Sequence, residues 1–141
     1  MRFSESRRQY TLGGLRRQDL AADPVEQFVQ WQDQAIAAGL ADPTACVLAT
    51  LQPERTLRQR MVLMKGIDDR GLVFFTNYQS GKAVALGESD AASMLFPWNE
   101  LDRQVSVTSA SCANNISRLS IGWLCAEAQA PSWLSRGREA K

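Results

Sequence analysis

The sequence contains no histidine in its 141 residues. Histidine is the commonest general base near neutral pH and the commonest protein ligand for zinc. Its absence excludes histidine-dependent catalytic triads and most zinc sites from this chain. We therefore expect no metal site, and any redox chemistry must be carried by a bound cofactor.

Cysteine is scarce as well. Cys46, Cys112 and Cys125 form no Cys-x-x-Cys pair, and an odd number cannot all be bridged within one chain. Disulfide frameworks of secreted proteins use even sets, so this pattern favours a reducing compartment. The sequence has no apolar run of membrane-spanning length, and the polar start Met1-Arg2-Phe3-Ser4-Glu5 is unlike a signal peptide. We expect a cytoplasmic protein.

The net charge is also small. Lysine and arginine number 16 and the acidic residues 15, which leaves a formal charge of +1. A nearly neutral chain has no bulk attraction to nucleic acid or to an anionic membrane. Arginines are nevertheless concentrated near the start, at positions 2, 7, 8, 16 and 17. This cluster is either a solvated tail or an anion-binding arm, and both interpretations stay open.

The length suits one domain, and the apolar fraction of 45% is typical of an ordinary globular core. We divide the chain into a basic N-terminal arm (1–22), one folded domain (23–107) and a tail (108–141). Apolar spacing becomes irregular in the tail. We expect the tail to be loosely packed or disordered.

A helix is predicted over residues 24–38. Asp23 is a suitable N-cap, Pro24 fits the first helical position, and Glu26 completes a capping-box pattern. Gly39 provides a C-terminal stop. The residues that we expect on its buried stripe are Val25, Phe28, Val29, Gln32 and Ile36.

Short strands follow this helix. Apolar stretches separated by turn residues predict strands over 45–51, 58–67, 72–77, 92–97 and 103–108. The Asp68-Asp69-Arg70-Gly71 run is a reversal signal, and Ser80 is the expected cap of a short helix over 80–86. Five short strands with tight turns favour a small antiparallel barrel over a parallel sheet.

Two basic residues, Arg60 and Lys65, bracket the apolar stretch Met61-Val62-Leu63-Met64. A phosphate monoester is bound by positive charge, and arginine and lysine supply it in complementary ways. Residues five apart on a regular strand face opposite sides, so these two reach one ligand only through a bulge, a strong twist or its opposite ends. The alternative is that both are solvated cations at strand ends.

A second candidate is the stretch from Phe74 to Lys82. Thr76, Ser80 and the first amides of the following helix can cradle a phosphate, with Lys82 adding charge. The alternative is an ordinary strand–turn–helix with a serine cap. Further on, Gln104 is either a hydrogen-bond partner for a flavin ring edge or an exposed strand residue.

Taken in order, these stretches resemble consecutive motifs of the pyridoxamine 5'-phosphate oxidase family. The resemblance runs from about Arg7 to Val107. It is carried by Arg7-Arg8-Gln9-Tyr10-Thr11-Leu12-Gly13-Gly14-Leu15, Ala41-Asp42-Pro43-Thr44-Ala45, Arg60-Met61-Val62-Leu63-Met64-Lys65, Val73-Phe74-Phe75-Thr76-Asn77, and Leu95-Phe96-Pro97-Trp98 through Arg103-Gln104-Val105.

The resemblance implies a mainly β protein with flanking helices, an FMN-binding split β-barrel of antiparallel, Greek-key type. It also implies a homodimer with FMN in a cleft between subunits, oxidising pyridoxamine or pyridoxine 5'-phosphate to pyridoxal 5'-phosphate and reducing oxygen to hydrogen peroxide. Substrate contacts are implied for Arg7, Arg8, Gln9, Tyr10 and Lys65. FMN contacts are implied for Arg60, Met61, Val62, Leu63, Met64, Lys65, Phe75, Thr76, Lys82 and Gln104.

The chain departs from the family pattern at two places. Gly81-Lys82 stands where the family usually has Arg-Lys, so one phosphate-binding cation is missing. After Val107 the resemblance ends, and an Arg-x-His element that contacts substrate in the family has no counterpart. We therefore keep two alternatives beside the oxidase: a non-catalytic remnant that binds FMN or pyridoxal phosphate, and another split-barrel flavin enzyme such as a flavin reductase. The arm motif Arg7–Tyr10 favours vitamin B6 chemistry over the last.

Overall fold

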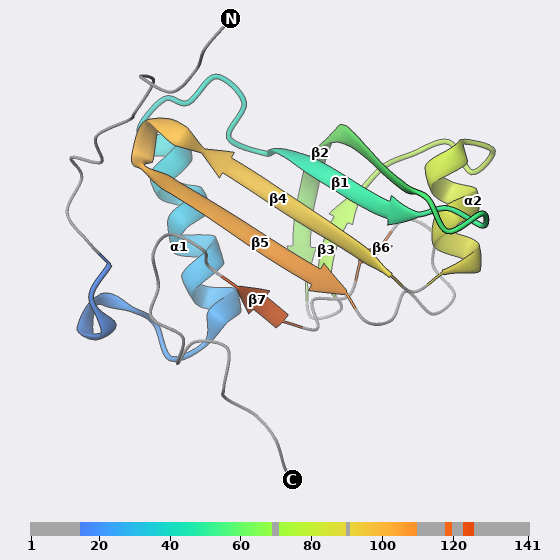
Figure 1. Ribbon diagram of the computed structural model, residues 1–141. Helices are drawn as coiled ribbons and strands as arrows, with labels where there is room; N and C mark the ends of the chain where they lie inside the picture. Colours follow the sequence, from blue (N-terminus) through green and yellow to red (C-terminus); the bar gives the residue numbers. More distant parts are fainter. Residues whose placement is uncertain (1–14, 69–70, 90, 110–117, 120–122, 126–141) are drawn as a thin grey trace, which may run out of the picture.

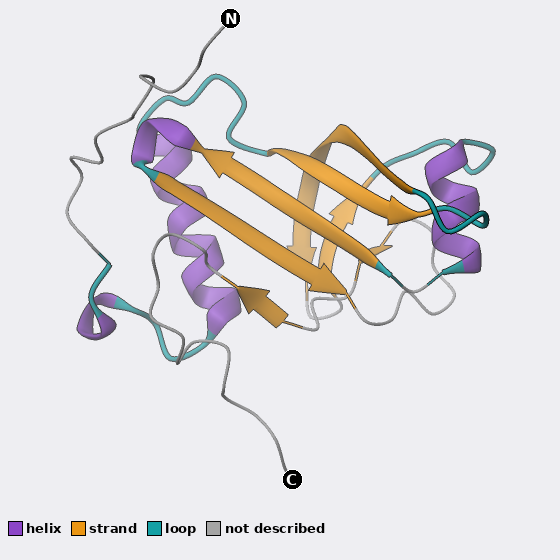
Figure 2. Cartoon of the chain, in the orientation of Figure 1, coloured by secondary structure: helices purple, strands orange, loops and turns teal. Residues whose placement is uncertain are grey.

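The computed structural model describes residues 15–68, 71–89, 91–109, 118–119 and 123–125. Its strands form a seven-stranded sheet in the order β6-β3-β2-β1-β4-β5-β7, and all neighbours pair antiparallel (Figures 1 and 2). The strands are β1 Ala45–Leu51, β2 Leu57–Asp68, β3 Gly71–Phe74, β4 Ala92–Trp98, β5 Arg103–Ser109, β6 Arg118–Leu119 and β7 Trp123–Cys125. The helices are α1 Pro24–Ala37 and α2 Gly81–Glu88, with short 3-10 helices η1 Arg17–Asp19 and η2 Asn99–Leu101.

The connection through α2 gives the sheet its topology. β1, β2 and β3 form a meander, and the chain then returns through α2 to place β4 beside β1. This order is that of a Greek key. β2 pairs with β1 along its first part and with β3 from Met64 onward, and the register shifts between Met64 and Gly66. The shift is a bulge at Lys65, which lets one long strand serve both parts of the curved sheet. The expected antiparallel, Greek-key architecture is confirmed.

Helix α1 begins where the sequence predicts and ends at Ala37, one residue earlier than predicted. The Asp23 carboxylate accepts a 2.7 Å hydrogen bond from the Val25 amide, Pro24 opens the helix, and Gly39 has a φ of +71° just beyond its end. The described side chain that bonds back to the segment before the helix is that of Gln27, not the predicted Glu26. The Gln27 side-chain oxygen accepts a 2.7 Å hydrogen bond from the Ala21 amide.

The predicted buried stripe of α1 is partly wrong. Phe28 and Gln32 are buried as expected, but Ile36 is 54% exposed and the neighbouring Ala35 is buried instead. Trp31 is also buried against the sheet, and its bulk fixes which side of the last turn faces inward. Gln32 is accommodated in this position because its side-chain amide donates to the Pro43 carbonyl at 2.9 Å.

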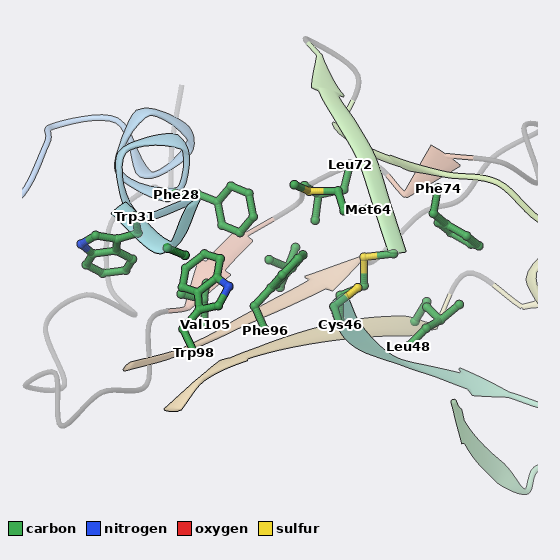
Figure 3. Close-up of a cluster of buried hydrophobic side chains, with 14 of the residues drawn as sticks. Phe28, Trp31, Cys46, Leu48, Met64, Leu72, Phe74, Phe96, Trp98 and Val105 are labelled. Atoms are coloured by element: carbon green, nitrogen blue, oxygen red, sulfur yellow. The ribbon is translucent and has the colours of Figure 1, made fainter. Parts of the chain in front are cut away.

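One face of the sheet carries the core. Alternate residues of β1 and β4 are buried on this face, as expected for strands with a side-chain period of two. Phe28 of α1 packs against Phe96 with ring centroids 4.9 Å apart and against Trp98 at 5.7 Å (Figure 3). The same cluster continues towards α2 through Leu48, Met64, Leu72, Phe74 and Leu86. The opposite face of the sheet bears Val47 and Leu95, which pair directly and are half-buried.

β3 is shorter than expected and ends at Phe74 rather than at residue 77. The Asn77 side chain accepts from the Gln79 amide at 2.8 Å, and the Asn77 carbonyl accepts from the Ser80 amide at 3.0 Å. These local bonds form a turn that competes with a strand ladder. The turn leads into α2, which Ser80 caps as predicted by accepting from the Ala83 amide.

The tail contains two short strands that the irregular apolar spacing does not predict. β6 pairs with β3, and β7 pairs with β5, so they occupy the two edges of the sheet. Residues 118–119 and 123–125 of the tail are thus paired in the sheet, a role that the irregular apolar spacing does not indicate. The rest of the tail after residue 109, and the arm residues Arg7–Tyr10, lie outside the described residues. In the part of the chain that is described, no helix has the length and apolarity to cross a membrane.

Candidate cofactor-binding site

A hollow of about 560 Å³ opens between the β1–β2 hairpin and the beginning of α2. Figure 1 shows α2 standing beside the end of β1, where this hairpin turns. Three of the residues that line the hollow are cationic, and none of its described lining residues is acidic. Such a lining selects for an anion. The lining residues are Gln52, Leu57, Arg58, Gln59, Arg60, Gly81 and Lys82.

Arg60 reaches the hollow from the inner face of the sheet. It pairs with Leu48, which is fully buried, so the two side chains share the core-facing side. The Arg60 Nη1 atom donates to the Leu48 carbonyl at 3.3 Å and to the Thr50 hydroxyl at 2.7 Å. Partial burial, with a smaller contribution from the charge of Arg58, lowers the pKa of Arg60 below its usual value. Arginine still keeps its charge at neutral pH, and these anchors hold that charge at the wall of the hollow.

Thr50 is the buried residue that fixes this arginine. Its hydroxyl accepts hydrogen bonds from Arg60 Nη1 and from the Gln52 side-chain nitrogen, the latter at 2.9 Å. Thr50 is 1% exposed, so it has little freedom to move away. Both anchors engage the same guanidinium nitrogen of Arg60, and no other described residue bonds its remaining donors, which can therefore serve a ligand.

The first turn of α2 forms the opposite wall. The Ser80 hydroxyl lies 3.1 Å from the Thr76 hydroxyl and accepts from the Lys82 ammonium at 3.4 Å. The free amides at a helix start carry partial positive charge, which favours an anion near Gly81 and Lys82. A Cβ added at Gly81 would meet no described atom within 4 Å, so a side chain can begin there without a clash.

The remaining candidate residues lie elsewhere. Arg60 and Lys82 line the hollow, whereas Lys65 and Thr76 do not. Lys65 is exposed at the bulge in β2. The Thr76 hydroxyl is hydrogen-bonded to the Ser80 hydroxyl, which also accepts from Lys82. The side chains between Arg60 and Lys65 alternate: Met61 and Leu63 are 59% and 45% exposed, whereas Met64 is buried and Val62 packs against the core. Phe75 is exposed beyond the end of β3.

Gln104 lies on the other face of the sheet from Arg60. It pairs with Pro97, whose strand neighbours Phe96 and Trp98 are both buried on the core side. Side chains alternate along a strand, so Pro97 and Gln104 project from the opposite side. One copy of the chain therefore does not bring Gln104 and Arg60 to the same ligand.

Five residues of this region were not among the candidates predicted from the sequence: Thr50, Gln52, Leu57, Arg58 and Gln59. A signal was present for Arg58, since residues two apart on a strand share a face and Arg60 was already a candidate. Nothing in the sequence indicated Gln52 or Thr50, because their role depends on the pairing of β1 with β2.

Solved structures with a similar fold support the split barrel. PhzG from Burkholderia lata, solved in complex with tetrahydrophenazine-1-carboxylic acid, is 31% identical with a TM-score of 0.61, over 64% of this chain and 45% of that one. A pyridoxamine 5'-phosphate oxidase-related, FMN binding protein from Nostoc punctiforme has a TM-score of 0.54 at 19% identity, over 63% of this chain and 46% of that one. The second likeness concerns the fold alone. The expected split β-barrel is confirmed.

Sequence relatives agree with the fold. The pyridoxine/pyridoxamine 5'-phosphate oxidase of Vibrio campbellii is 49% identical over 108 residues, covering 77% of this chain and 51% of that protein. The protein of the same name from an Enterobacter species is 54% identical over 102 residues, covering 72% and 47%. The chain thus spans about half the length of these curated relatives. The family model described as pyridoxamine 5'-phosphate oxidase matches residues 32–117, and the chain belongs to that family.

Proposed function

We propose that this chain binds FMN and serves the FMN-dependent oxidation of pyridoxamine or pyridoxine 5'-phosphate to pyridoxal 5'-phosphate, with oxygen as acceptor. The observation that carries the proposal is that Arg60 and Lys82 line the same hollow. None of the described residues that line it is acidic. Both belong to sequence motifs that resemble the family's cofactor-binding stretches. The names of the similar curated proteins support the substrate class.

The residues at the hollow suit the phosphate end of FMN. A phosphate monoester carries up to two negative charges and several acceptor oxygens. Arg60 offers donors held in place by Thr50, and Lys82 offers a charge beside the α2 amides. Bound FMN would supply the two-electron acceptor that the chain's own side chains lack. The protein's part is to bind and orient FMN and the substrate.

We extend the cofactor contacts to the other motif residues, Met61–Lys65, Phe75, Thr76 and Gln104, and these contacts imply a second copy of the chain. Arg60 and Gln104 project from opposite faces of the sheet, so one FMN molecule reaches both only when they come from different subunits. The exposed side chains of Met61 and Leu63 support a homodimer, because they form apolar surface on the same outer face as Gln104. The arm Arg7–Tyr10 is proposed to contact the substrate.

A second candidate is a protein that binds FMN or pyridoxal phosphate without turnover. Gly81 favours it, because this position supplies no cation to the hollow although the structure has room for one.

Absorption spectroscopy of the purified protein, incubated with FMN and freed of excess cofactor, tests both candidates. Retained flavin absorbance shows cofactor binding. Anaerobic pyridoxine 5'-phosphate should then bleach the flavin band as it is oxidised to pyridoxal 5'-phosphate, and readmitted oxygen should restore the band as it is reduced to hydrogen peroxide. If the protein retains flavin but the substrate does not bleach it, only the second candidate, binding without turnover, is supported. Failure to retain FMN would contradict the oxidase.

A further inference from the structure

Arg58 is a cation of the hollow that neither the motifs nor the family resemblance assigns. It lies on β2 directly opposite Thr50 and two residues before Arg60, so Arg58, Arg60 and Thr50 share one face of the sheet. Its side chain is exposed and lines the hollow together with Arg60 and Lys82. Within the described residues, Arg58 has no hydrogen bond or ion pair.

The two arginines are close enough to repel each other. The charge of Arg58 contributes to lowering the pKa of Arg60, and no acidic residue in the described lining offsets either charge. Adjacent like charges cost free energy in a protein without a ligand. A bound dianion reverses this cost, since both cations then face opposite charge.

The two arginines also differ in freedom. Arg60 is anchored by the Leu48 carbonyl and the Thr50 hydroxyl, whereas Arg58 is unanchored within the described part of the chain. We propose that Arg58 is a third phosphate-binding cation, which closes over a phosphate monoester that Arg60 and Lys82 hold in the hollow. The proposal rests on the proposed binding of FMN at this site and adds a residue that determines how tightly its phosphate group is held.

The test compares Arg58→Gln with Arg55→Gln in the purified full chain. Arg55 is an exposed arginine of the same hairpin that does not line the hollow, so its substitution removes the same charge without touching the site. FMN and riboflavin are titrated by quenching of flavin fluorescence at low and at moderate salt. We expect Arg58→Gln to raise the Kd for FMN by about tenfold at low salt and less at higher salt. The Kd for riboflavin should not change, and Arg55→Gln should leave both values within about twofold.

The unfolding temperature gives an independent readout. Without ligand, Arg58→Gln should unfold at the same temperature as the wild type or slightly above it, because repulsion of Arg60 is relieved. With FMN, the wild type should gain more thermal stability than this variant. The role of Arg58 would be overturned if the two glutamine variants bound FMN equally well. It would also be overturned if Arg58→Gln lost as much affinity for riboflavin as for FMN.

A failure of the proposed function is distinguishable from a failure of this inference. If the wild type does not bind FMN, the same three proteins are titrated with inorganic phosphate and followed by backbone amide NMR shifts of Gly81 and Lys82. Weaker phosphate binding in Arg58→Gln than in Arg55→Gln would then keep the phosphate clamp and reject FMN. Phosphate binding that is absent or equal in all three proteins would reject the clamp.

Discussion

The Nη1 atom of Arg60 lies 2.7 Å from the hydroxyl oxygen of Thr50. The two residues are diagonal neighbours on β2 and β1, since Arg60 pairs with Leu48 and Thr50 with Arg58. A buried hydroxyl thus orients a partly exposed guanidinium at the edge of the hollow. This contact across the hairpin, together with the longer bond to the Leu48 carbonyl, positions the arginine that we propose to bind phosphate.

Replacing Thr50 by valine keeps the shape of the side chain and removes the acceptor. We expect Thr50→Val to raise the Kd for FMN by about 2- to 10-fold, the scale of one net hydrogen bond. It should also lower thermal stability, because the buried Gln52 side-chain nitrogen loses its partner. Thr50→Ser retains the hydroxyl and serves as the control. A valine variant that binds FMN as tightly as the serine variant would show that Arg60 needs no such anchor.

Gly81 provides a gain-of-function test. Its position at the start of α2 has no described atom within 4 Å of an added Cβ, so the first carbon of a longer side chain meets no obstacle there. Gly81→Arg should tighten FMN binding by about 1–3 kcal/mol, the scale of an added charge-assisted contact. Gly81→Ala adds the Cβ without the charge and should leave the Kd nearly unchanged. Equal Kd values for the arginine and alanine variants would place the phosphate away from α2.

The subunit arrangement is tested by complementation. Arg60→Ala and Gln104→Ala each damage the proposed FMN site, but on opposite faces of the sheet. If each site takes Arg60 from one subunit and Gln104 from the other, a mixed dimer of the two variants contains one site with both residues intact. Refolding an equimolar mixture should therefore recover about a quarter of the wild-type FMN content, as random assembly predicts. Recovery no better than the average of the separate variants would place both residues in one subunit.

Cys46 reports on the integrity of the core. It is fully buried on β1, and burial raises the pKa of its thiol to about 12. In a Cys112→Ser, Cys125→Ser background, Cys46 should react with a thiol reagent at pH 8 at least about a hundredfold more slowly in the folded than in the unfolded protein. Because the pKa is raised on folding, this thiol's contribution to stability is complete below about pH 8.5 and is lost as the pH rises towards 12. Rapid labelling of the folded protein would contradict the described core.

Local signals predicted the elements that are stabilised locally. Asp23 and Pro24 set the start of α1, and Ser80 caps α2, because each acts through its own nearby backbone. The side of α1 that faces the core was harder to predict. It is decided by contact of Trp31 and Phe28 with the sheet, and the exposed Ile36 shows that apolar spacing alone does not settle it.

The hollow and the tail strands depend on contacts between distant segments. β6 and β7 have two and three residues, so they are strands only by pairing with β3 and β5. Arg58 and Lys82 line the same hollow because α2 lies beside the hairpin of β1 and β2, an arrangement that no local pattern encodes. The motif resemblance names Arg60 and Lys82, which both line the hollow, but it does not name the neighbours that hold them.

The central claim is that the hollow holds the phosphate of FMN, and the comparison of FMN with riboflavin tests it most directly. The two ligands differ in the phosphate group, so their Kd ratio measures what the cationic hollow contributes. We predict that wild-type protein binds FMN about a hundredfold or more tightly than riboflavin, since two charge-assisted contacts are involved. Lys82→Ala should weaken FMN binding by about 1–3 kcal/mol and leave riboflavin binding unchanged. Equal Kd values for FMN and riboflavin in the wild-type protein would contradict the account.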